Sequence, residues 1–276
     1  MENTAGKTPE EIKESVKHAY SSLWSSETTC CSPTPTRSCG TLKQGYSSLD
    51  AAARTRLFEE LSPKQGMKIL DVGSGLGNTV LAIAEKVKPT GRAVGVDFSE
   101  SAIAISQEKA EQAGLKGVTE FKLGDAENLP FGDETFDAVI SECVVCLVPD
   151  KQKALDEKVR VLKPGGRVVM HDVVVHAPMP EAMRSNPALY CGCIGGAVSI
   201  YDYKTMMEKA GLQEIRIVDF TGEVENAMNA IVLSVAANLE KSTLLRQALQ
   251  FVHKGGLGYA LFSGTCLLYT SDAADE

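Results

Sequence analysis

The stretch Lys68-Ile69-Leu70-Asp71-Val72-Gly73-Ser74-Gly75-Leu76-Gly77 decides the fold of this chain. Its largely apolar residues 69–72 predict a short buried strand. Three glycines follow at alternate positions, and residues 78–85 then have a helical pattern. Glycines at such a turn permit a sharp bend, contact between a ligand and bare backbone, and close packing of helix on strand. The stretch therefore predicts the opening strand, turn and helix of a nucleotide-binding α/β sheet.

The spacing of the glycines bears on which cofactor binds there. The dinucleotide fingerprint is G-x-G-x-x-G, whereas Gly73, Gly75 and Gly77 form G-x-G-x-G after the acidic Asp71. This variant resembles motif I of the S-adenosylmethionine (SAM)-dependent methyltransferases. A glycine triplet alone is also compatible with a plain turn, so the elements that follow carry the argument.

Composition and charge narrow the class of protein. The 276 residues are 43% hydrophobic and 23% charged, which is typical of a globular protein. The apolar runs are too short to span a bilayer, and the first residues have no leader pattern. Both observations predict a cytoplasmic protein without a membrane partner. The net charge of −8, without a basic cluster, argues against nucleic acid. Eight cysteines without a secretory signal favour reduced thiols over a disulfide scaffold.

Further strands and helices alternate after the glycine turn, as in a βαβ fold. Their order resembles the class I SAM methyltransferases over about residues 64–175. It predicts a Rossmann-like α/β fold with a mostly parallel seven-stranded sheet and helices on both faces, plus an N-terminal cysteine-bearing arm and an inserted cysteine loop. The strands expected after the first are residues 92–97, 118–123, 136–141, 167–174, 212–220 and 231–235.

Acidic residues end three of these strands. An acid placed like Asp97 commonly binds ribose hydroxyls, and its alternative role is to cap the next helix. In methyltransferases an acid placed like Asp125 hydrogen-bonds the adenine amine, and a turn-forming aspartate is the alternative. Glu142 reaches the carboxyl edge of the sheet, where ligands of open α/β sheets bind. The expected cofactor-binding residues are Asp71, Gly73, Ser74, Gly75, Gly77, Asp97, Phe98, Asp125, Ala126 and Glu142.

The chain divides into four segments. Residues 1–63 comprise a helix over 9–25 and an arm carrying Cys30, Cys31 and Cys39, and residues 64–175 form the SAM-binding core. Residues 176–265 are expected to contain an inserted loop and to complete the sheet. Residues 266–276 look like a translated sequencing adapter, which implies truncation near residue 265, and a genuine acidic tail is the alternative.

The positions of the cysteines indicate the substrate. Cys143 and Cys146 follow a strand beside the expected methyl donor, and Cys191 and Cys193 lie in a small-residue loop. Thiols from distant segments that can converge on one methyl donor indicate a soft, thiophilic substrate. Structural zinc is the weaker alternative, because Cys191-x-Cys193 lacks the usual spacing of a zinc knuckle. For the arm cysteines, thiols without a function are the alternative.

Residues 141–151, 160–166 and 190–197 resemble the arsenite SAM methyltransferases, and the resemblance covers roughly residues 10–235. It implies that the thiolates of Cys143 and Cys193 hold trivalent arsenic as substrate. An arm cysteine, Cys31 or Cys30, would be the third ligand. Many members carry a further cysteine where residues 40–68 have none, so which arm thiol binds and which resolves a disulfide stays open.

The resemblance implies arsenite methyltransferase activity in detoxification. The arsenic lone pair attacks the methyl group of SAM, and no general base is needed because arsenic carries no proton. His171 and His176 are therefore expected to be structural or ribose-side groups. Transfer oxidises arsenic to As(V), so Cys30, Cys31 and Cys39 are candidates for returning it to As(III), with glutathione or thioredoxin as the reductant. A monomer is expected.

Two other functions remain open. A methyltransferase acting on carbon or oxygen of a small apolar metabolite, such as a quinone or sterol precursor, would share the core motifs. A non-enzymatic thiol-rich sensor of metals or metalloids would bind arsenic without turnover. The intact set of glycines and acids speaks against the sensor.

Overall fold

The computed structural model of this chain describes residues 8–25, 53–223 and 243–267. The strands are β1 (Lys68–Val72), β2 (Arg92–Asp97), β3 (Thr119–Leu123), β4 (Phe136–Glu142), β5 (Leu162–Val175), β6 (Val198–Ser199), β7 (Leu212–Asp219) and β8 (Leu257–Cys266). The helices are α1 (Pro9–Ser25), α3 (Asn78–Val87), α4 (Glu100–Gln112), α5 (Lys151–Arg160), α6 (Glu181–Arg184), α7 (Pro187–Cys191), α8 (Ile200–Lys209) and α10 (Thr243–His253), together with a helix over residues 53–61.

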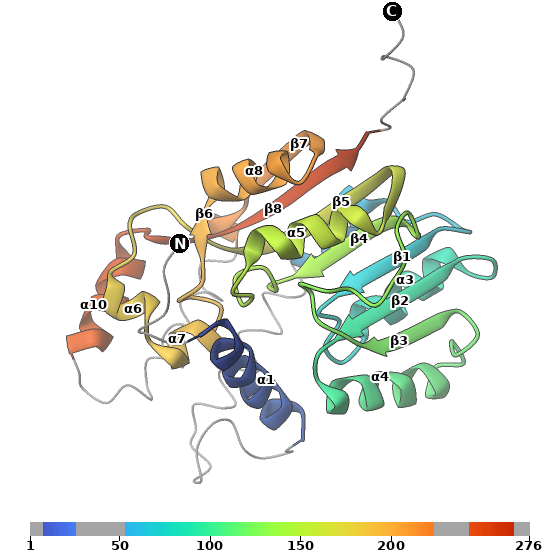
Figure 1. Cartoon of the computed structure of the whole chain (residues 1–276), viewed down its shortest axis with the longest axis horizontal. Coiled ribbons are helices and arrows are strands. Elements are labelled where there is room, and N and C mark those ends of the chain that lie inside the picture. Colours follow the sequence, from blue (N-terminus) through green and yellow to red (C-terminus); the bar gives the residue numbers. More distant parts are fainter. Residues whose placement is uncertain (1–7, 26–52, 224–242, 268–276) are drawn as a thin grey trace, which may run out of the picture.

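The strands form one sheet in the order β3-β2-β1-β4-β5-β8-β7, with β6 paired to β5 (Figure 1). Strands β1 to β5 pair in parallel, and β8 runs antiparallel to both β5 and β7. A parallel sheet needs cover on both faces, which the crossover helices provide. The predicted mostly parallel, Rossmann-like fold is confirmed.

The side chains of the central strand β1 point alternately to the two faces of the sheet, and each face has its own buried core. Ile69 packs in one buried cluster with the helix over residues 53–61, α3 and α10. Leu70, the next residue, packs in the other with α5 and α8. Successive side chains of a strand point to opposite faces, so adjacent apolar residues of β1 serve both layers.

The glycine turn after β1 is fastened to the neighbouring strand. The N–H groups of Gly73 and Ser74 donate to the Val96 carbonyl at 2.7 and 3.0 Å. A Cβ atom on Gly73 would lie 2.3 Å from Cγ2 of Val144, so the turn packs directly on the segment after β4. The carboxyl ends of β1, β2 and β4 therefore meet at one edge of the sheet.

Strand β8 is the main departure from the sequence prediction. The last strand expected, residues 231–235, lies outside the described residues. β8 instead pairs with β5 from Arg167 to Val175 and also pairs with β7. It ends at Cys266, the first residue of the segment expected to be adapter-derived. The part of the sheet that completes the fold is thus antiparallel and comes from the end of the described chain.

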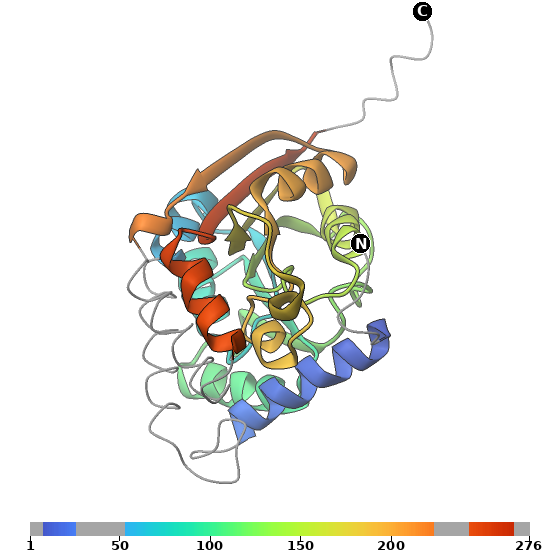
Figure 2. The ribbon, with the colours of Figure 1, turned by 90° about the vertical axis from the view of Figure 1, so that its left-hand side faces the viewer.

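Helix α1 packs beside α4 and α7 along the carboxyl edge of the sheet (Figures 1 and 2). Its start has a capping box, because the Thr8 hydroxyl accepts from the Glu11 N–H at 3.2 Å and a Glu11 carboxylate oxygen accepts from the Thr8 N–H at 2.7 Å. Ile12 and Val16 form its buried face. None of the helices in the described part of the chain is both long and apolar enough to span a membrane.

Candidate active site

The glycine turn lies among three carboxylates. Asp97 is buried, and its two oxygens accept from the N–H groups of Gly75 and Ser99, both at 2.9 Å. Asp71 is also buried, and its pKa is raised well above the usual value by burial and then by the negative charges of Glu142 and Asp97. A cationic ligand placed here would relieve this repulsion.

The chemistry of the turn fits SAM. The Asp71 Oδ1 and Ser74 Oγ atoms are buried and have no hydrogen-bond partner among the described residues. Buried polar atoms need partners, and a ligand with an ammonium and a sulfonium group supplies donors and positive charge. In this structure Asp97 holds the turn in place, and the N-cap of the next helix, α4, is Ser99. Its contact with a ribose remains a prediction.

Asp125, the residue expected at the adenine, contacts helix α1. Lys13 Nζ lies 2.7 Å from carboxylate oxygens of both Asp125 and Glu127. Phe98 packs against the buried α1 cluster, and Ala126 packs against the core on the α5 side of the sheet. Helix α1 therefore covers this side of the expected cofactor site.

The two cysteines expected to bind arsenic lie together. Cys143 follows β4 and Cys193 follows α7, and the Cys193 Sγ is 3.8 Å from the Cys143 carbonyl oxygen, 50 residues away in sequence. Both have left-handed backbones, with φ of 53° and 66°. Residues other than glycine rarely adopt this conformation, and such strain clusters at functional sites.

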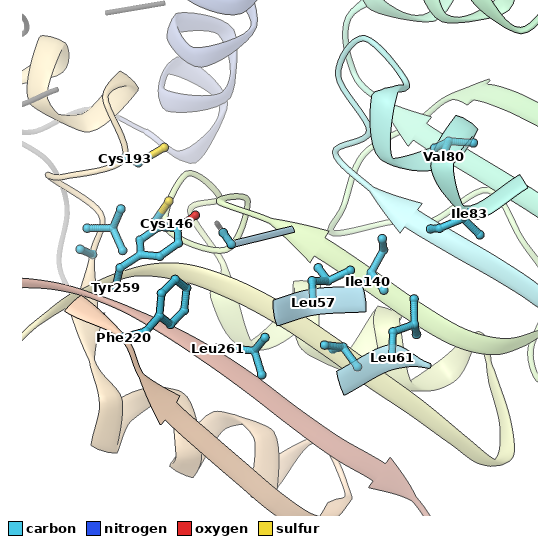
Figure 3. Close-up of a cluster of buried hydrophobic side chains, with 14 of the residues drawn as sticks. Leu57, Leu61, Val80, Ile83, Ile140, Cys146, Cys193, Phe220, Tyr259 and Leu261 are labelled. Atoms are coloured by element: carbon cyan, nitrogen blue, oxygen red, sulfur yellow. The ribbon is translucent and has the colours of Figure 1, made fainter. Parts of the chain in front are cut away.

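A third thiol joins this pair. Cys193 is hydrogen-bonded to the thiols of Cys143 and Cys146, and Tyr20 Oη lies 3.6 Å from its sulfur. The hydrogen bonds from Cys143, Cys146 and Tyr20 hold the pKa of Cys193 well below its ordinary value despite burial. The bond to Cys193, and then burial, raise the pKa of Cys143. Cys146, Cys193 and Tyr259 lie at one end of a buried cluster (Figure 3).

The remaining cysteines are placed differently. Cys191 lies on α7, and its thiol donates to the Ser15 carbonyl of α1 at 3.8 Å. Cys30, Cys31 and Cys39, including both candidates for the third arsenic ligand, lie outside the described residues. Within the described ranges, no group of three or more His, Cys, Asp or Glu side chains is arranged to hold a metal ion.

A chain of hydrogen bonds connects Cys143 to Thr79 at the start of helix α3, directly after the glycine turn, and the sequence analysis missed it. Cys143 Sγ lies 2.9 Å from Tyr259 Oη, which lies 2.6 Å from His171 Nδ1. His171 Nε2 lies 2.9 Å from a Glu142 oxygen, and the other Glu142 oxygen accepts from the Thr79 hydroxyl. His171 is therefore more than a packing group. The signal for Tyr259 was the apolar run 259–262 between glycines, which is typical of a buried strand.

Comparison with known proteins identifies the family. The profile of the family described as "Methyltransferase domain" matches residues 63–211. An arsenite methyltransferase of Halobacterium salinarum is 33% identical over an alignment of 238 residues, and the match covers 77% of this chain and 60% of that protein. A demethylmenaquinone methyltransferase of Staphylococcus aureus is 33% identical over an alignment of 193 residues, and the match covers 62% of this chain and 78% of that protein.

A solved structure has the same fold. The arsenic (III) S-adenosylmethionine methyltransferase of Chlamydomonas reinhardtii superposes with a TM-score of 0.57 at 24% identity. The match covers 76% of this chain and 66% of that one. The chain spans only 60% of the length of the Halobacterium relative.

Proposed function

Because this chain belongs to the methyltransferase-domain family and has the class I SAM-dependent fold, we propose that it transfers the methyl group of SAM to trivalent arsenic held by Cys143 and Cys193. The single observation that carries the proposal is the meeting of these two thiols beside the carboxyl end of β4. Trivalent arsenic is soft and prefers thiolate to oxygen ligands. The 33% identity to an arsenite methyltransferase supports the same substrate.

The residues of the site have distinct tasks in this reaction. SAM, when bound, supplies an electrophilic methyl group. The hydrogen bonds from Cys143, Cys146 and Tyr20 lower the pKa of Cys193, which favours its thiolate, the form that binds a metalloid. The buried thiol cluster then fixes the position of the arsenic and keeps water away, and positioning is the main source of rate for a nucleophile without a proton to lose.

The thiol chemistry of turnover is part of the same proposal. Cys30 and Cys31 would supply a third ligand and the electrons that return As(V) to As(III), with disulfide formation. Glutathione or thioredoxin would then reduce the disulfide. Both cysteines lie outside the described residues, so the proposal for them rests on the sequence pattern.

Arsenic speciation after incubation with SAM, arsenite and a thiol reductant tests the proposal. We expect Cys143→Ser and Cys193→Ser to lower the methylation rate by about 100-fold or more, since a hydroxyl is a poor ligand for a soft centre. Cys191→Ser is the matched control, because Cys191 lies two residues from Cys193 but its thiol contacts α1. Full activity in both of the first two variants contradicts the assignment.

A second candidate is methyl transfer to a small apolar metabolite of the quinone type. It is favoured by the match to 78% of a demethylmenaquinone methyltransferase, a larger share than for the arsenite relative. In that case the cysteines are packing residues. The same three Cys→Ser variants would then retain methyl transfer to a demethylmenaquinone, and arsenite would yield no methylated product.

A further inference from the structure

We propose that Tyr259, His171 and Glu142 form a relay that accepts the proton of Cys143 when this thiol binds a thiophilic ligand. The proposal deepens the arsenic function above and rests on it for the identity of the ligand. Its physical basis is the unbroken series of contacts of 2.9, 2.6 and 2.9 Å from sulfur to phenol, imidazole and carboxylate.

The three relay side chains come from three neighbouring strands. Glu142 ends β4, and its register partner on β5 is His171. Tyr259 on β8 is opposite Val173, so it lies diagonal to His171 across the pair. His171 and Tyr259 are 1% and 0% exposed. Burying such groups costs free energy unless each is paired, and here every one is.

Before proton transfer, each hydrogen bond between Cys143 and Glu142 has a defined donor and acceptor. The Glu142 carboxylate only accepts, and it accepts from the Thr79 hydroxyl and from His171 Nε2. A neutral imidazole with a proton on Nε2 accepts at Nδ1, so Tyr259 donates to it. The Tyr259 oxygen is then free to accept the single proton of the Cys143 thiol, which this thiol can direct either to Tyr259 or to the Cys193 sulfur.

The same heavy-atom positions also suit the transferred state. If His171 is an imidazolium, it donates to Tyr259 from Nδ1 and to Glu142 from Nε2. Tyr259 then donates to a Cys143 thiolate. A proton can thus pass from sulfur to imidazole without rearrangement, and the result is an ion pair flanked by the Glu142 carboxylate.

Proton transfer balances the ligand exchange on arsenic. The Cys143 sulfur forms a bond to arsenic, and a bond from arsenic to hydroxide or to a carrier thiolate breaks. The Cys143 proton passes to Tyr259 as the Tyr259 proton passes to His171. The imidazolium gives its proton back to Tyr259, and Tyr259 passes a proton to the leaving hydroxide or thiolate, which departs as water or thiol. Arsenic stays trivalent, and no oxidant or reductant takes part.

Other groups also shift the pKa of the Cys143 thiol and therefore affect the pH dependence of its reactivity. Cys193 and Asp172 raise the pKa of Cys143, and burial adds to their effect. At the far end of the relay, Arg54 favours the charged form of Glu142, whereas Glu142 raises the pKa of Asp71. Among the described residues, the titratable and charged groups that interact with the relay and its thiol are Cys146, Cys193, Asp172, Tyr203, Asp71 and Arg54.

The test is the rate at which iodoacetamide alkylates Cys143 in the full chain as a function of pH, resolved by peptide mass spectrometry. Tyr259→Phe keeps the ring and removes the bridging oxygen. Losing a hydrogen bond to a charged group is worth about one pH unit or more, so we expect the midpoint for Cys143 to rise by about that much. Alkylation of Cys191 in the same sample is the internal control.

A second variant makes the test independent of local packing at Tyr259. His171→Gln interrupts the next step, and a series relay predicts that the double variant reacts no more slowly than either single variant. If Tyr259 and His171 have only structural roles, their effects on the alkylation rate should add in the double variant, and the pH midpoint of Cys143 should not move. If the profiles of Tyr259→Phe and His171→Gln both superimpose on that of the parent chain, the relay does not exist. Alkylation needs no arsenic, so this outcome is separate from a failure of arsenic methylation.

Discussion

At single residues, the site depends on backbone conformations that side chains rarely adopt. Cys143 and Cys193 have φ of 53° and 66°, each next to a tightly packed segment. Gly73 has φ of 77° and faces Val144, which immediately follows Cys143. The glycine turn and the first thiol are therefore held against each other, and a change in one should disturb the other.

Gly73→Ala tests this coupling. The new Cβ would lie 2.3 Å from a Val144 methyl group, in addition to the strain of a left-handed alanine. We expect about 1–2 kcal/mol from the backbone and about 1–3 kcal/mol from overpacking, measured by urea unfolding. Gly114→Ala is the control, because Gly114 has φ of 68° and a methyl group added there would have nothing within 4 Å. Equal losses in the two variants would show that the contact with Val144 is unimportant.

The sequence predicted the site residues that belong to a local pattern, and it missed those whose contacts are far away along the chain. Cys143 and the acids at strand ends follow directly from the strand pattern. Tyr259 is 116 residues from the thiol that it contacts, and Tyr20 is 173 residues from Cys193. No local period encodes such contacts, because the folding of separate segments onto one edge creates them.

At the scale of elements, helix α5 carries a buried charge without an ion-pair partner among the described residues. Lys158 is 0% exposed, and its ammonium makes a long hydrogen bond of 3.5 Å to the Ala154 carbonyl. Burial lowers the pKa of Lys158 from 10.5 to about 8, against a smaller opposing attraction to Asp172. The folded chain thus holds this proton less tightly than the unfolded chain does.

Lys158→Met should change the pH dependence of stability. Between pH about 8 and 10.5 the unfolded chain binds more protons at this residue, so the parent becomes more stable as pH rises through that window. Below it the parent bears a constant penalty of about 3 kcal/mol. We expect urea unfolding of the Met variant to lack this rise and to show higher stability at pH 7. A parallel pH dependence in the two chains would mean that burial leaves the pKa of Lys158 at its ordinary value.

The elements that sequence predicted best are those with a clear period and punctuation. β1, β2 and β4 are apolar runs closed by an acid or a glycine turn, and they lie where they were expected. β8 was missed because Gly258 and Gly264 interrupt its pattern. A Cβ atom at position 258 would lie 2.0 Å from His176 Nε2, so a larger residue there would displace the His176 side chain.

Across the whole molecule, the site is closed by segments from both ends of the described chain. Helix α1 contributes Lys13 and Tyr20, and β8 contributes Tyr259. The core between them supplies Cys143 and the glycine turn, and the loop after α7 supplies Cys193. The family profile over residues 63–211 therefore covers the cofactor turn and the two expected thiols but neither terminal contribution.

Truncation before β8 tests how far the fold depends on its terminal strand. β8 lies between β5 and β7, and its buried side chains enter both cores: Leu257, Tyr259 and Leu261 pack in one and Ala260 and Phe262 in the other. A chain ending at residue 256 would leave two strand edges unpaired and two cores open. We expect the free-energy cost of this loss to exceed the stability of a typical domain, which is roughly 5–15 kcal/mol.

We expect that chain to lose cooperative thermal unfolding, measured by circular dichroism, and to lose SAM binding, measured by calorimetry. A chain ending at residue 267 keeps all of β8 and is the matched control, for which we expect both properties to persist. Cooperative unfolding of the shorter chain would show that residues 64–175 fold without the antiparallel strand. In that case the fold would not depend on β8, and Tyr259, which β8 carries, would serve the site without being needed for folding.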